Sequence, residues 1–564
     1  MDAAGKLKDV IARFGTGHGV VLELDLARGV LEARPSNPLQ ALQVVNATSL
    51  NRLRDALREA AADERVKGLV VHAVPTTISA TAHDEIGQLV EEFGTHKPTL
   101  AWAESFGELS NALVAYKLAT ACHEVWVQPT GMLCVGGVEV QLLLLKGLLN
   151  KAGVDPQFGQ RHEVKSAAET YAGSEISQAN REMTTRLGQS VVDDAAATIA
   201  RRRGIPLETA WQAINASPLT PAQAKELGLI DRVGYRDEAY TAALEEWGAT
   251  SEELRYVHRY SAKPSFSKRI AERSRPQVGV VTLRGPIVTG RGESGLGGSS
   301  AGSDVVDEHL RAALRDDDIK AVLFEVESPG GSAVASDFIR RSVLRLREAG
   351  KPVVAVMGSL AASGGYYVSM GATEIVAQPT TLTGSIGVLG GKMVTKRLYE
   401  KLDLVREAIP IGASAGMLSS AQEFTEEDWA RLDAWLDRVY LDFTTFAASD
   451  RGMDYDELEA VAKGRVWTGA DAHQRGLVDH LGGHRLGLQR AAELAGLDPE
   501  AVAVTRVGDS GLLNRLIPAA SSESRTGAGG GGAVSSEDLL TRVATWAGVR
   551  VPGPVSLPFT IRIR

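Results

Sequence analysis

The stretch PVVAVMGSLAASGGYY, residues 352–367, contains a buried strand and the start of a helix. Its first part, 352–357, is a continuous apolar run of the kind found inside parallel sheets, and the small residues after Ser363 predict a helix. A serine at a sharp strand-to-helix turn can expose its hydroxyl as a nucleophile. The same serine could instead be only the cap of that helix. Residues elsewhere in the chain decide between these two interpretations.

Strands and helices alternate through most of the chain. In the first part we predict strands at 20–24, 66–72, 98–103 and 124–127, with helices at 50–62, 83–93 and 112–120. In the second part we predict strands at 278–283, 319–326, 352–357 and 374–377, with helices at 310–315 and 336–348. This alternation predicts βαβ units and an α/β fold with mostly parallel sheets.

The same order of elements occurs twice. A Gln-Pro-Thr triplet begins at Gln128 and again at Gln378, 250 residues later. The predicted strands that start at Val66 and Ile319 lie 253 residues apart, and a Gly-Leu-X-Asp sequence recurs after 248 residues. Three landmarks at nearly constant spacing predict a tandem duplication.

The repeat divides the chain into five predicted parts. These are an N-terminal helix (1–17), a first repeat (18–236), a charged linker (237–276), a second repeat (277–497), and a Gly-rich tether with a C-terminal tail (498–564). The polar, Gly/Ser-rich stretch 289–303 is expected to be a mobile surface loop within the second repeat.

The composition is that of a soluble globular protein. The 564 residues are 44% hydrophobic and carry a net charge of −9, which disfavours a nucleic-acid partner. The two cysteines fit neither a disulfide framework nor a zinc site, so no metal or other cofactor is expected. The N-terminus lacks the apolar core of a signal peptide, and charges interrupt the longest apolar stretch, 131–149. We therefore expect a cytoplasmic or peripherally membrane-associated protein without a transmembrane segment.

The two repeats differ at positions that matter for chemistry. Alignment on Gln-Pro-Thr places Leu113 opposite Ser363, so the first repeat lacks the serine. Conversely, the first repeat contains HEVKSAAE (162–169), whereas its counterpart in the second, 409–417, has no lysine. No histidine and carboxylate accompany Ser363 in a triad pattern, so a lysine with a lowered pKa is the candidate base. We predict Ser363 as nucleophile and Lys165 as general base; Lys165 could otherwise be an exposed lysine where a helix starts.

The second repeat contains further candidate groups. The sequence SPGGS (328–332) follows a predicted strand at its carboxyl end, where α/β sheets place their sites. The N–H of Gly330 or Gly331 could join that of Gly364 to stabilise an oxyanion. Ser385 could hydrogen-bond the lysine amine and orient it. Locally, these residues could equally form an ordinary strand-to-helix turn and a simple turn serine.

In their order and spacing these motifs resemble the signal peptide peptidase (SppA, protease IV) family in its long tandem form. The motifs are HEVKSAAE (162–169), SPGGS (328–332), GSLAASGGYYVS (358–369), QPTTLTGSIGV (378–388) and GRVWTGADAHQRGLVDHLGG (464–483). The resemblance implies a duplicated ClpP/crotonase-like fold of repeated ββα superhelical units. It also implies a Ser363–Lys165 dyad with Ser385 orienting the lysine, and a homotetramer that degrades cleaved signal peptides and unfolded, apolar polypeptide.

One feature departs from this family. Its long members commonly begin with a membrane-spanning anchor, and this sequence shows none, which leaves the compartment open. The function predicted is that of a serine endopeptidase with a Ser–Lys dyad. Two alternatives are an acyl-CoA enzyme on a crotonase-like scaffold and a catalytically inactive scaffold that binds peptides.

Overall fold

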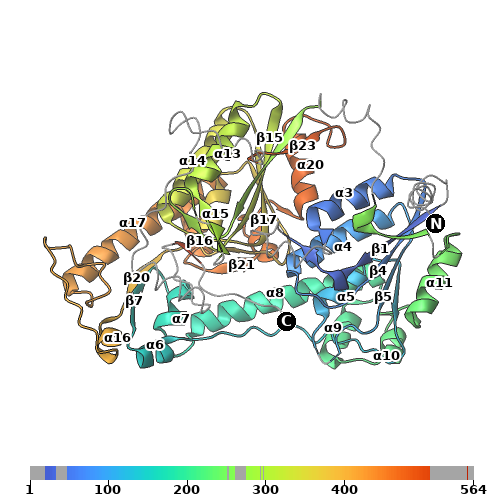
Figure 1. The fold of residues 1–564 in the computed structure, drawn as a ribbon, viewed down its shortest axis with the longest axis horizontal. Helices are drawn as coiled ribbons and strands as arrows, with labels where there is room; N and C mark the ends of the chain where they lie inside the picture. The colour runs from blue at the N-terminus through green and yellow to red at the C-terminus, as the bar shows by residue number, and fades with distance from the viewer. Residues whose placement is uncertain are drawn as a thin grey trace, which may run out of the picture. The chain divides into compact units, whose positions relative to one another are not determined.

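The chain folds into two compact units, each built on a sheet flanked by helices (Figure 1). The computed structural model describes residues 19–32, 48–108, 110–250, 253–260, 275–292, 294–295, 298–508 and 555–556. Unit 1 consists of Met1–Val138 and Val192–Ser265, and unit 2 of Glu139–Val191 and Phe266–Ile563. The predicted helix 1–17 and most of the predicted tail lie outside the described residues.

Unit 1 is organised around a parallel sheet with the strand order β8-β6-β5-β4-β1-β9. Its strands are β1 (Val20–Asp25), β4 (Val66–His72), β5 (Thr99–Ala103), β6 (Glu124–Val127), β8 (Arg232–Val233) and β9 (Leu254–Tyr256). Two short strands, β2 (Val30–Leu31) and β3 (Thr48–Ser49), pair with each other. The helices are α3 (Leu50–Ala61), α4 (Ala80–Gly94), α5 (Leu113–Ala119), α9 (Leu207–Ala216), α10 (Pro221–Glu226), α11 (Arg236–Glu246) and the second part of α8 (Gln178–Arg203).

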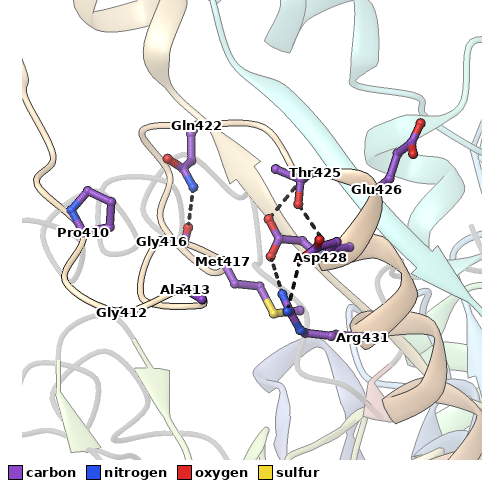
Figure 2. Close-up of a pocket in the computed structure, with 11 residues that line it drawn as sticks. Pro410, Gly412, Ala413, Gly416, Met417, Gln422, Thr425, Glu426, Asp428 and Arg431 are labelled. Carbon is purple, nitrogen blue, oxygen red and sulfur yellow. Dashed lines mark hydrogen bonds and ion pairs between the residues drawn. The ribbon is translucent and has the colours of Figure 1, made fainter.

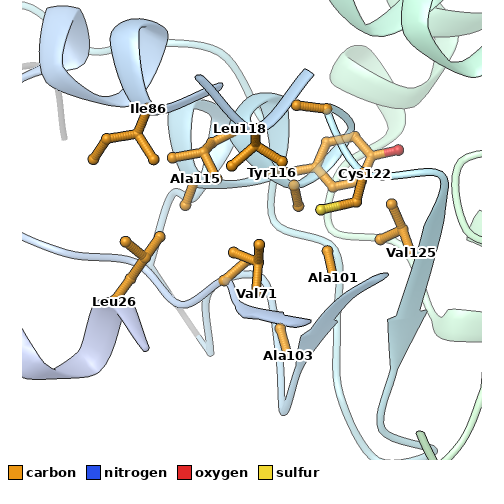
Figure 3. Close-up of a cluster of buried hydrophobic side chains, with 14 of the residues drawn as sticks. Leu26, Val71, Ile86, Ala101, Ala103, Ala115, Tyr116, Leu118, Cys122 and Val125 are labelled. Atoms are coloured by element: carbon orange, nitrogen blue, oxygen red, sulfur yellow. The ribbon is translucent and has the colours of Figure 1, made fainter. Parts of the chain in front are cut away.

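Both faces of the unit 1 sheet are buried, because alternate strand residues point to opposite sides. On one face Val71 and Ala101 lie opposite side chains of α4 and α5 such as Ile86 and Tyr116 (Figure 3). On the other face a separate cluster that includes Trp102 packs against α11. Double burial explains why these strands are continuous apolar runs in the sequence.

Unit 2 contains a longer sheet in the order β21-β19-β17-β15-β10-β23, with β18 and β22 extending from β17. Its strands are β10 (Gln277–Arg284), β15 (Ile319–Ser328), β17 (Val353–Ala362), β18 (Glu374–Ala377), β19 (Leu382–Gly384), β21 (Val466–Thr468), β22 (His480–Leu481) and β23 (Ala503–Arg506). Only the β19–β21 pair of this sheet is antiparallel among the described residues. Helices α13 (Ser303–Arg315), α14 (Ala333–Glu348) and α15 (Gly364–Met370) lie on one face and α20 (His484–Leu494) on the other (Figure 1).

Further elements of unit 2 surround this sheet. The helices are α6 (Lys146–Ala152), α7 (Glu169–Ala172), α16 (Lys396–Lys401), α17 (Glu426–Arg451), α18 (Tyr455–Val461) and α19 (Gly469–His473). Strand β7 (Asp155–Gln160) pairs with β20 (Leu389–Val394), and β11 (Ile287–Val288), β14 (Ala301–Gly302), β16 (Gly330–Gly331) and β24 (Val555–Ser556) form a small sheet. No helix in the described ranges is both long enough and apolar enough to cross a membrane.

The predicted duplication is confirmed by a helix and an arginine–aspartate pair that the two units share. Helices α8 and α17 have the same length, 26 residues, and end in an arginine that binds an aspartate. Arg203 donates to Asp231 at 2.8 Å in unit 1, and Arg451 donates to Asp479 at 2.6 Å in unit 2. In both units the same arginine also donates to the carbonyl oxygen of the equivalent glycine, Gly228 or Gly476.

Some stretches are more ordered than their sequence pattern indicates. The predicted linker 237–276 continues α11 and contains β9, an edge strand of the unit 1 sheet. The predicted tether 498–564 contains β23, the matching edge strand of unit 2, which pairs with β10. The loop 289–303 contains a paired hairpin, β12 (Ser294–Gly295) with β13 (Gly298–Ser299), and the strand β14. These strands have two to four residues, too few to show a hydrophobic period.

The stretch 139–191 lies in the chain between β6 and β8 of the first sheet but belongs to unit 2. Strand β7 pairs with β20 along its whole length. The first part of α8 places Met183 and Leu187 in a cluster with Ala362 and Val466. Part of the first repeat is thus built into the unit that contains the second repeat.

The Arg451–Asp479 pair should be a main anchor of unit 2, because the arginine side chain is only 7% exposed. Arg451→Ala leaves Asp479 and the carbonyl of Gly476 without this donor, so we expect the free energy of unfolding to fall by about 2–4 kcal/mol. Urea unfolding measures the change. Arg431→Ala, which removes the exposed pair with Glu427 and a 3.5 Å contact with Asp428, should change it by less than about 0.5 kcal/mol. Equal effects of the two substitutions would contradict the prediction.

Candidate active site

Ser363 lies at the turn between β17 and α15, as the sequence predicts. Its backbone has φ 56° and ψ −113°, which is a strained conformation for a residue with a side chain. The backbone N–H donates to the carbonyl oxygen of Gly384 at 2.8 Å, which holds the turn against β19. The hydroxyl makes no capping bond to α15. Ser363 therefore stands at the N-cap position of α15 without capping the helix through its side chain.

The structure brings Lys165 to Ser363, although 198 residues separate them. The lysine Nζ lies 2.9 Å from Ser363 Oγ, 2.8 Å from Ser385 Oγ and 2.9 Å from the carbonyl oxygen of Ser385. All three residues lie in unit 2. Lys165 is only 1% exposed, so it is not the surface lysine of the alternative interpretation.

Two glycines that the sequence did not single out make room for the lysine. A Cβ on Gly464 would lie 2.5 Å from Lys165 Cβ, and a Cβ on Gly387 would lie 3.2 Å from Lys165 Cδ. Gly464 also has φ +78°, which favours glycine for a second reason. Gly387 belongs to the motif 378–388 and Gly464 to the motif 464–483, so their place in these motifs was the signal available in the sequence. Ser385, with φ 51°, is also held in a left-handed conformation beside them.

Burial lowers the pKa of Lys165 to about 7, and no carboxylate in the described part of the chain opposes this effect. Lys117 in unit 1, another buried lysine, shows the contrast. It contacts Asp84 and Asp194, and these carboxylates raise its pKa despite the same degree of burial. The lowered pKa of Lys165 therefore results from burial among uncharged groups, and its amine can be neutral near pH 7.

The three predicted oxyanion glycines lie close together. A Cβ on Gly364 would lie 3.0 Å from Gly330 Cα and 3.1 Å from the backbone nitrogen of Gly331. The N–H of Gly330 donates to Ser328 Oγ at 3.1 Å, so that donor is already engaged. The N–H groups of Gly331 and Gly364 are the better candidates to bind a developing oxyanion.

The strand that contains two of these glycines also pairs with other segments. β16 lies parallel to β11 and antiparallel to β24, with Gly330 opposite Ser556 and Gly331 opposite Val555. An extended segment can thus form a ladder directly beside the candidate oxyanion donors.

A separate surface pocket lies at the start of α17 (Figure 2). Pro410, Gly416 and Met417 line one side, and Asp428 and Arg431 of the helix line the other. Thr425 caps the helix by accepting from the N–H of Asp428, and the Asp428 carboxylate accepts from the N–H of Thr425 and also contacts Arg431. None of the predicted catalytic residues lines this pocket.

Comparison with known proteins finds relatives over most of the chain. The model of peptidase family S49 matches residues 91–250 and 345–498. The chloroplastic serine protease SPPA of Arabidopsis thaliana is 32% identical over 79% of this chain and 65% of its own length. Protease 4 of Salmonella typhi is 30% identical over 86% of this chain and 79% of its own length. A solved mutant of the 1510-N membrane-bound stomatin-specific protease matches with a TM-score of 0.28 and 17% identity, covering 42% of this chain and all of that one.

These findings define the class of protein as a serine-type peptidase with a duplicated α/β fold. The chain belongs to peptidase family S49.

The buried amine should make the stability of the fold depend on pH. Because the pKa of Lys165 is about 7 when folded and near 10.5 when unfolded, the unfolded chain binds more protons between these values. Raising the pH through this window therefore stabilises the native protein relative to Lys165→Met, by on the order of 4 kcal/mol in total. Urea unfolding of both proteins from pH 6 to 10.5 measures the difference.

Lys117→Met is the matched control for this experiment. It leaves Asp84 and Asp194 buried without their cation, so it should lower stability at neutral pH. A constant difference between the native protein and Lys165→Met across the whole pH range would contradict a lowered lysine pKa.

Proposed function

We propose that this chain is a serine endopeptidase with Ser363 as nucleophile, Lys165 as general base and Ser385 as the residue that positions the lysine. The observation that carries the proposal is the 2.9 Å contact between Lys165 Nζ and Ser363 Oγ in a buried site. An ammonium group there could not accept the hydroxyl proton, whereas an amine with a pKa of about 7 can.

The contacts of Lys165 suit a base with a defined orientation. A neutral amine has two N–H groups and one lone pair. If the two N–H groups donate to the hydroxyl and carbonyl oxygens of Ser385, at 2.8 and 2.9 Å, the lone pair remains for the Ser363 hydroxyl. Ser385 therefore acts through the lysine and need not touch the substrate.

The reaction then proceeds as a two-step acyl transfer. Lys165 takes the Ser363 proton while the serine oxygen attacks the peptide carbonyl carbon, and the N–H groups of Gly331 and Gly364 stabilise the oxyanion. The lysine returns the proton to the leaving amine as the peptide bond breaks. Water, deprotonated by the same lysine, then cleaves the acyl-enzyme and restores Ser363.

The proposed substrates are cleaved signal peptides and other unfolded, apolar polypeptides. The antiparallel pairing of β24 with β16 supports binding of an extended chain beside the oxyanion donors. The names of the relatives, serine protease SPPA and Protease 4, support a proteolytic role. We further propose a homo-oligomer, a tetramer by family resemblance, with a possible peripheral contact to membranes.

A serine-directed fluorophosphonate should label the native protein at Ser363. Ser363→Ala removes the nucleophile and Lys165→Met removes the base, so each variant should lose the label and peptide hydrolysis together. Mass spectrometry identifies the labelled residue, and fluorescence on a gel measures the rate of labelling. The control is Ser369→Ala, because this buried serine of α15 bonds only within its helix, to the carbonyl of Gly365. Label retained by Ser363→Ala would exclude the proposed nucleophile.

Peptide hydrolysis should increase with pH. Below a pKa of about 7 the lysine is protonated and cannot accept the serine proton, so kcat/KM should fall about tenfold per pH unit and level off above that value. A fluorogenic peptide assayed from pH 5 to 9 tests this. Ser385→Ala should lower kcat and move the midpoint, because the amine loses a hydroxyl partner. A rate that is flat from acid to alkaline pH would be incompatible with a lysine base.

A further inference from the structure

Two short turns in unit 1 place basic side chains at one edge of its sheet. The 3₁₀ helix η1 (Leu26–Arg28) follows β1, and a second one, η4 (Val257–Arg259), follows β9. Because β1 and β9 are parallel neighbours, both turns lie at the carboxyl edge of the sheet, where α/β folds place their ligand sites. The dyad proposed above lies in unit 2 and does not use this edge.

Each turn is fixed to the core of unit 1 by one buried residue. Leu26 of η1 is 1% exposed and belongs to the buried cluster that includes side chains of α4 and α5 (Figure 3). Val257 of η4 is also 1% exposed and belongs to the same cluster. The backbone positions of both turns are therefore set by the core, as a binding site requires. The basic side chains of the turns are instead half-buried or exposed, namely Arg28, His258 and Arg259.

The ring of Tyr256, the last residue of β9, gathers these cations. The guanidinium carbon of Arg28 lies 4.5 Å from the ring centroid, and that of Arg259 lies 5.8 Å from it. The His258 imidazole stacks on the same ring, with centroids 5.4 Å apart and planes inclined by 16°. Arg52 of α3 joins the group, because its Nη2 donates to the carbonyl oxygen of the residue after η4 at 2.6 Å. We call Arg28, Arg52, His258 and Arg259 the basic cluster.

The carboxylates of β1 are engaged by other partners. Glu23 accepts hydrogen bonds from Arg236 and from the Tyr240 hydroxyl, each at 2.9 Å. Asp25, which directly precedes η1, lies 2.8 Å from the Nδ1 atom of His72. Neither carboxylate is therefore available to neutralise the basic cluster.

The basic cluster itself lacks a compensating anion. Among the described residues, none of its members forms an ion pair with a carboxylate. The Nε atom of Arg28 is buried and has no hydrogen-bond partner in the described part of the chain. Burial, together with the charges of Arg28, Arg259 and Arg52, lowers the pKa of His258. Three guanidinium groups thus lie around one imidazole without a counter-charge, an arrangement that a bound anion would stabilise.

The duplicated fold does not require these cations. The registers of the strand pairs make Gly285 the counterpart of Arg28 and Gly508 the counterpart of His258. At the spacing of the repeats, Arg52 of α3 corresponds to Val305 of α13. Unit 2 thus keeps the same strands and helix without the charges. The basic cluster is therefore a feature of unit 1 and not of the fold.

We propose that the basic cluster binds a phosphate group, carried either by a soluble phosphorylated molecule or by a phospholipid headgroup. The planar forks of its three arginines match phosphate oxygens, and such charge-assisted hydrogen bonds are stronger than neutral ones. The charge of the phosphate also offsets the repulsion among the cations. This site lies in the repeat that lacks the serine, and the inference does not rest on the proposed peptidase function.

Inorganic phosphate is the first probe, tested on the full chain with Ser363→Ala so that hydrolysis by the proposed dyad is excluded. At equal ionic strength, phosphate should raise the unfolding temperature above its value in chloride, because a ligand that binds only the native state stabilises it. Isothermal titration calorimetry gives the Kd. Arg28→Gln with Arg259→Gln should weaken the Kd by at least about tenfold and remove the temperature shift, since two charge-assisted contacts are lost.

Two further double variants separate phosphate binding from a loss of charge or of folding. Arg58→Gln with Arg255→Gln is the charge-matched control, because both residues are exposed in unit 1 and Arg255 points to the opposite face of the sheet from Tyr256. It should keep the Kd and the temperature shift. Arg28→Lys with Arg259→Lys keeps the charges without the planar forks, so its Kd should lie between those of the native and glutamine proteins. This variant tests the site even where the glutamine variant does not fold.

Vesicles distinguish the two sources of the phosphate group. Co-sedimentation is measured with phosphatidylcholine vesicles that contain or lack phosphatidic acid. Binding that requires phosphatidic acid and is lost in Arg28→Gln with Arg259→Gln identifies a headgroup, whereas phosphate binding without vesicle binding identifies a soluble ligand. A phosphate shift or vesicle binding that the glutamine variant retains in full would overturn the proposal. Absence of both phosphate and vesicle binding in the chain with an intact basic cluster would overturn it as well.

Discussion

The burial of one amine among uncharged groups is the constraint on which the rest of unit 2 depends. Among the described residues, the hydrogen-bond partners of Lys165 Nζ are the hydroxyl oxygens of Ser363 and Ser385 and the carbonyl oxygen of Ser385, so burial favours its neutral form. A carboxylate nearby would reverse the effect, as Asp84 and Asp194 do for Lys117. Gly387 and Gly464 leave room for the lysine side chain, and the strained turn places Ser363 within 2.9 Å of its amine.

The duplication explains how such a site could be assembled from distant parts of the chain. Both repeats keep the same structural anchor, an arginine at the end of a 26-residue helix bound to an aspartate. The two repeats differ at the residues of the candidate site. The second repeat has Ser363 where the first has Leu113, and the first has Lys165 where the counterpart segment of the second, 409–417, has no lysine. A strand of the first repeat pairs with the second, which carries the lysine segment into unit 2. A serine and a lysine of one chain thereby come into contact without a second subunit.

The sequence predicts the buried strands closely. The predicted bounds of β4 and β6 agree with the structure to the residue, because strands buried on both faces are continuous apolar runs between turn residues. The edge strands β9 and β23 were missed, since three or four half-exposed residues have no period to detect. Long-range ladders such as β7 with β20 leave no local signal either.

The sequence by itself determined the duplication and the alternating order of strands and helices. It also singled out Ser363 and Lys165, each of which is present in one repeat and absent from the other. These are properties of spacing and residue type, which the linear chain contains. Only the tertiary structure decided that 139–191 packs into unit 2, that Ser363 does not cap its helix, and that Gly387 and Gly464 border the lysine. The physical reason is that burial, strain and the pKa of Lys165 arise from groups far apart in sequence, and they exist only once the chain has folded.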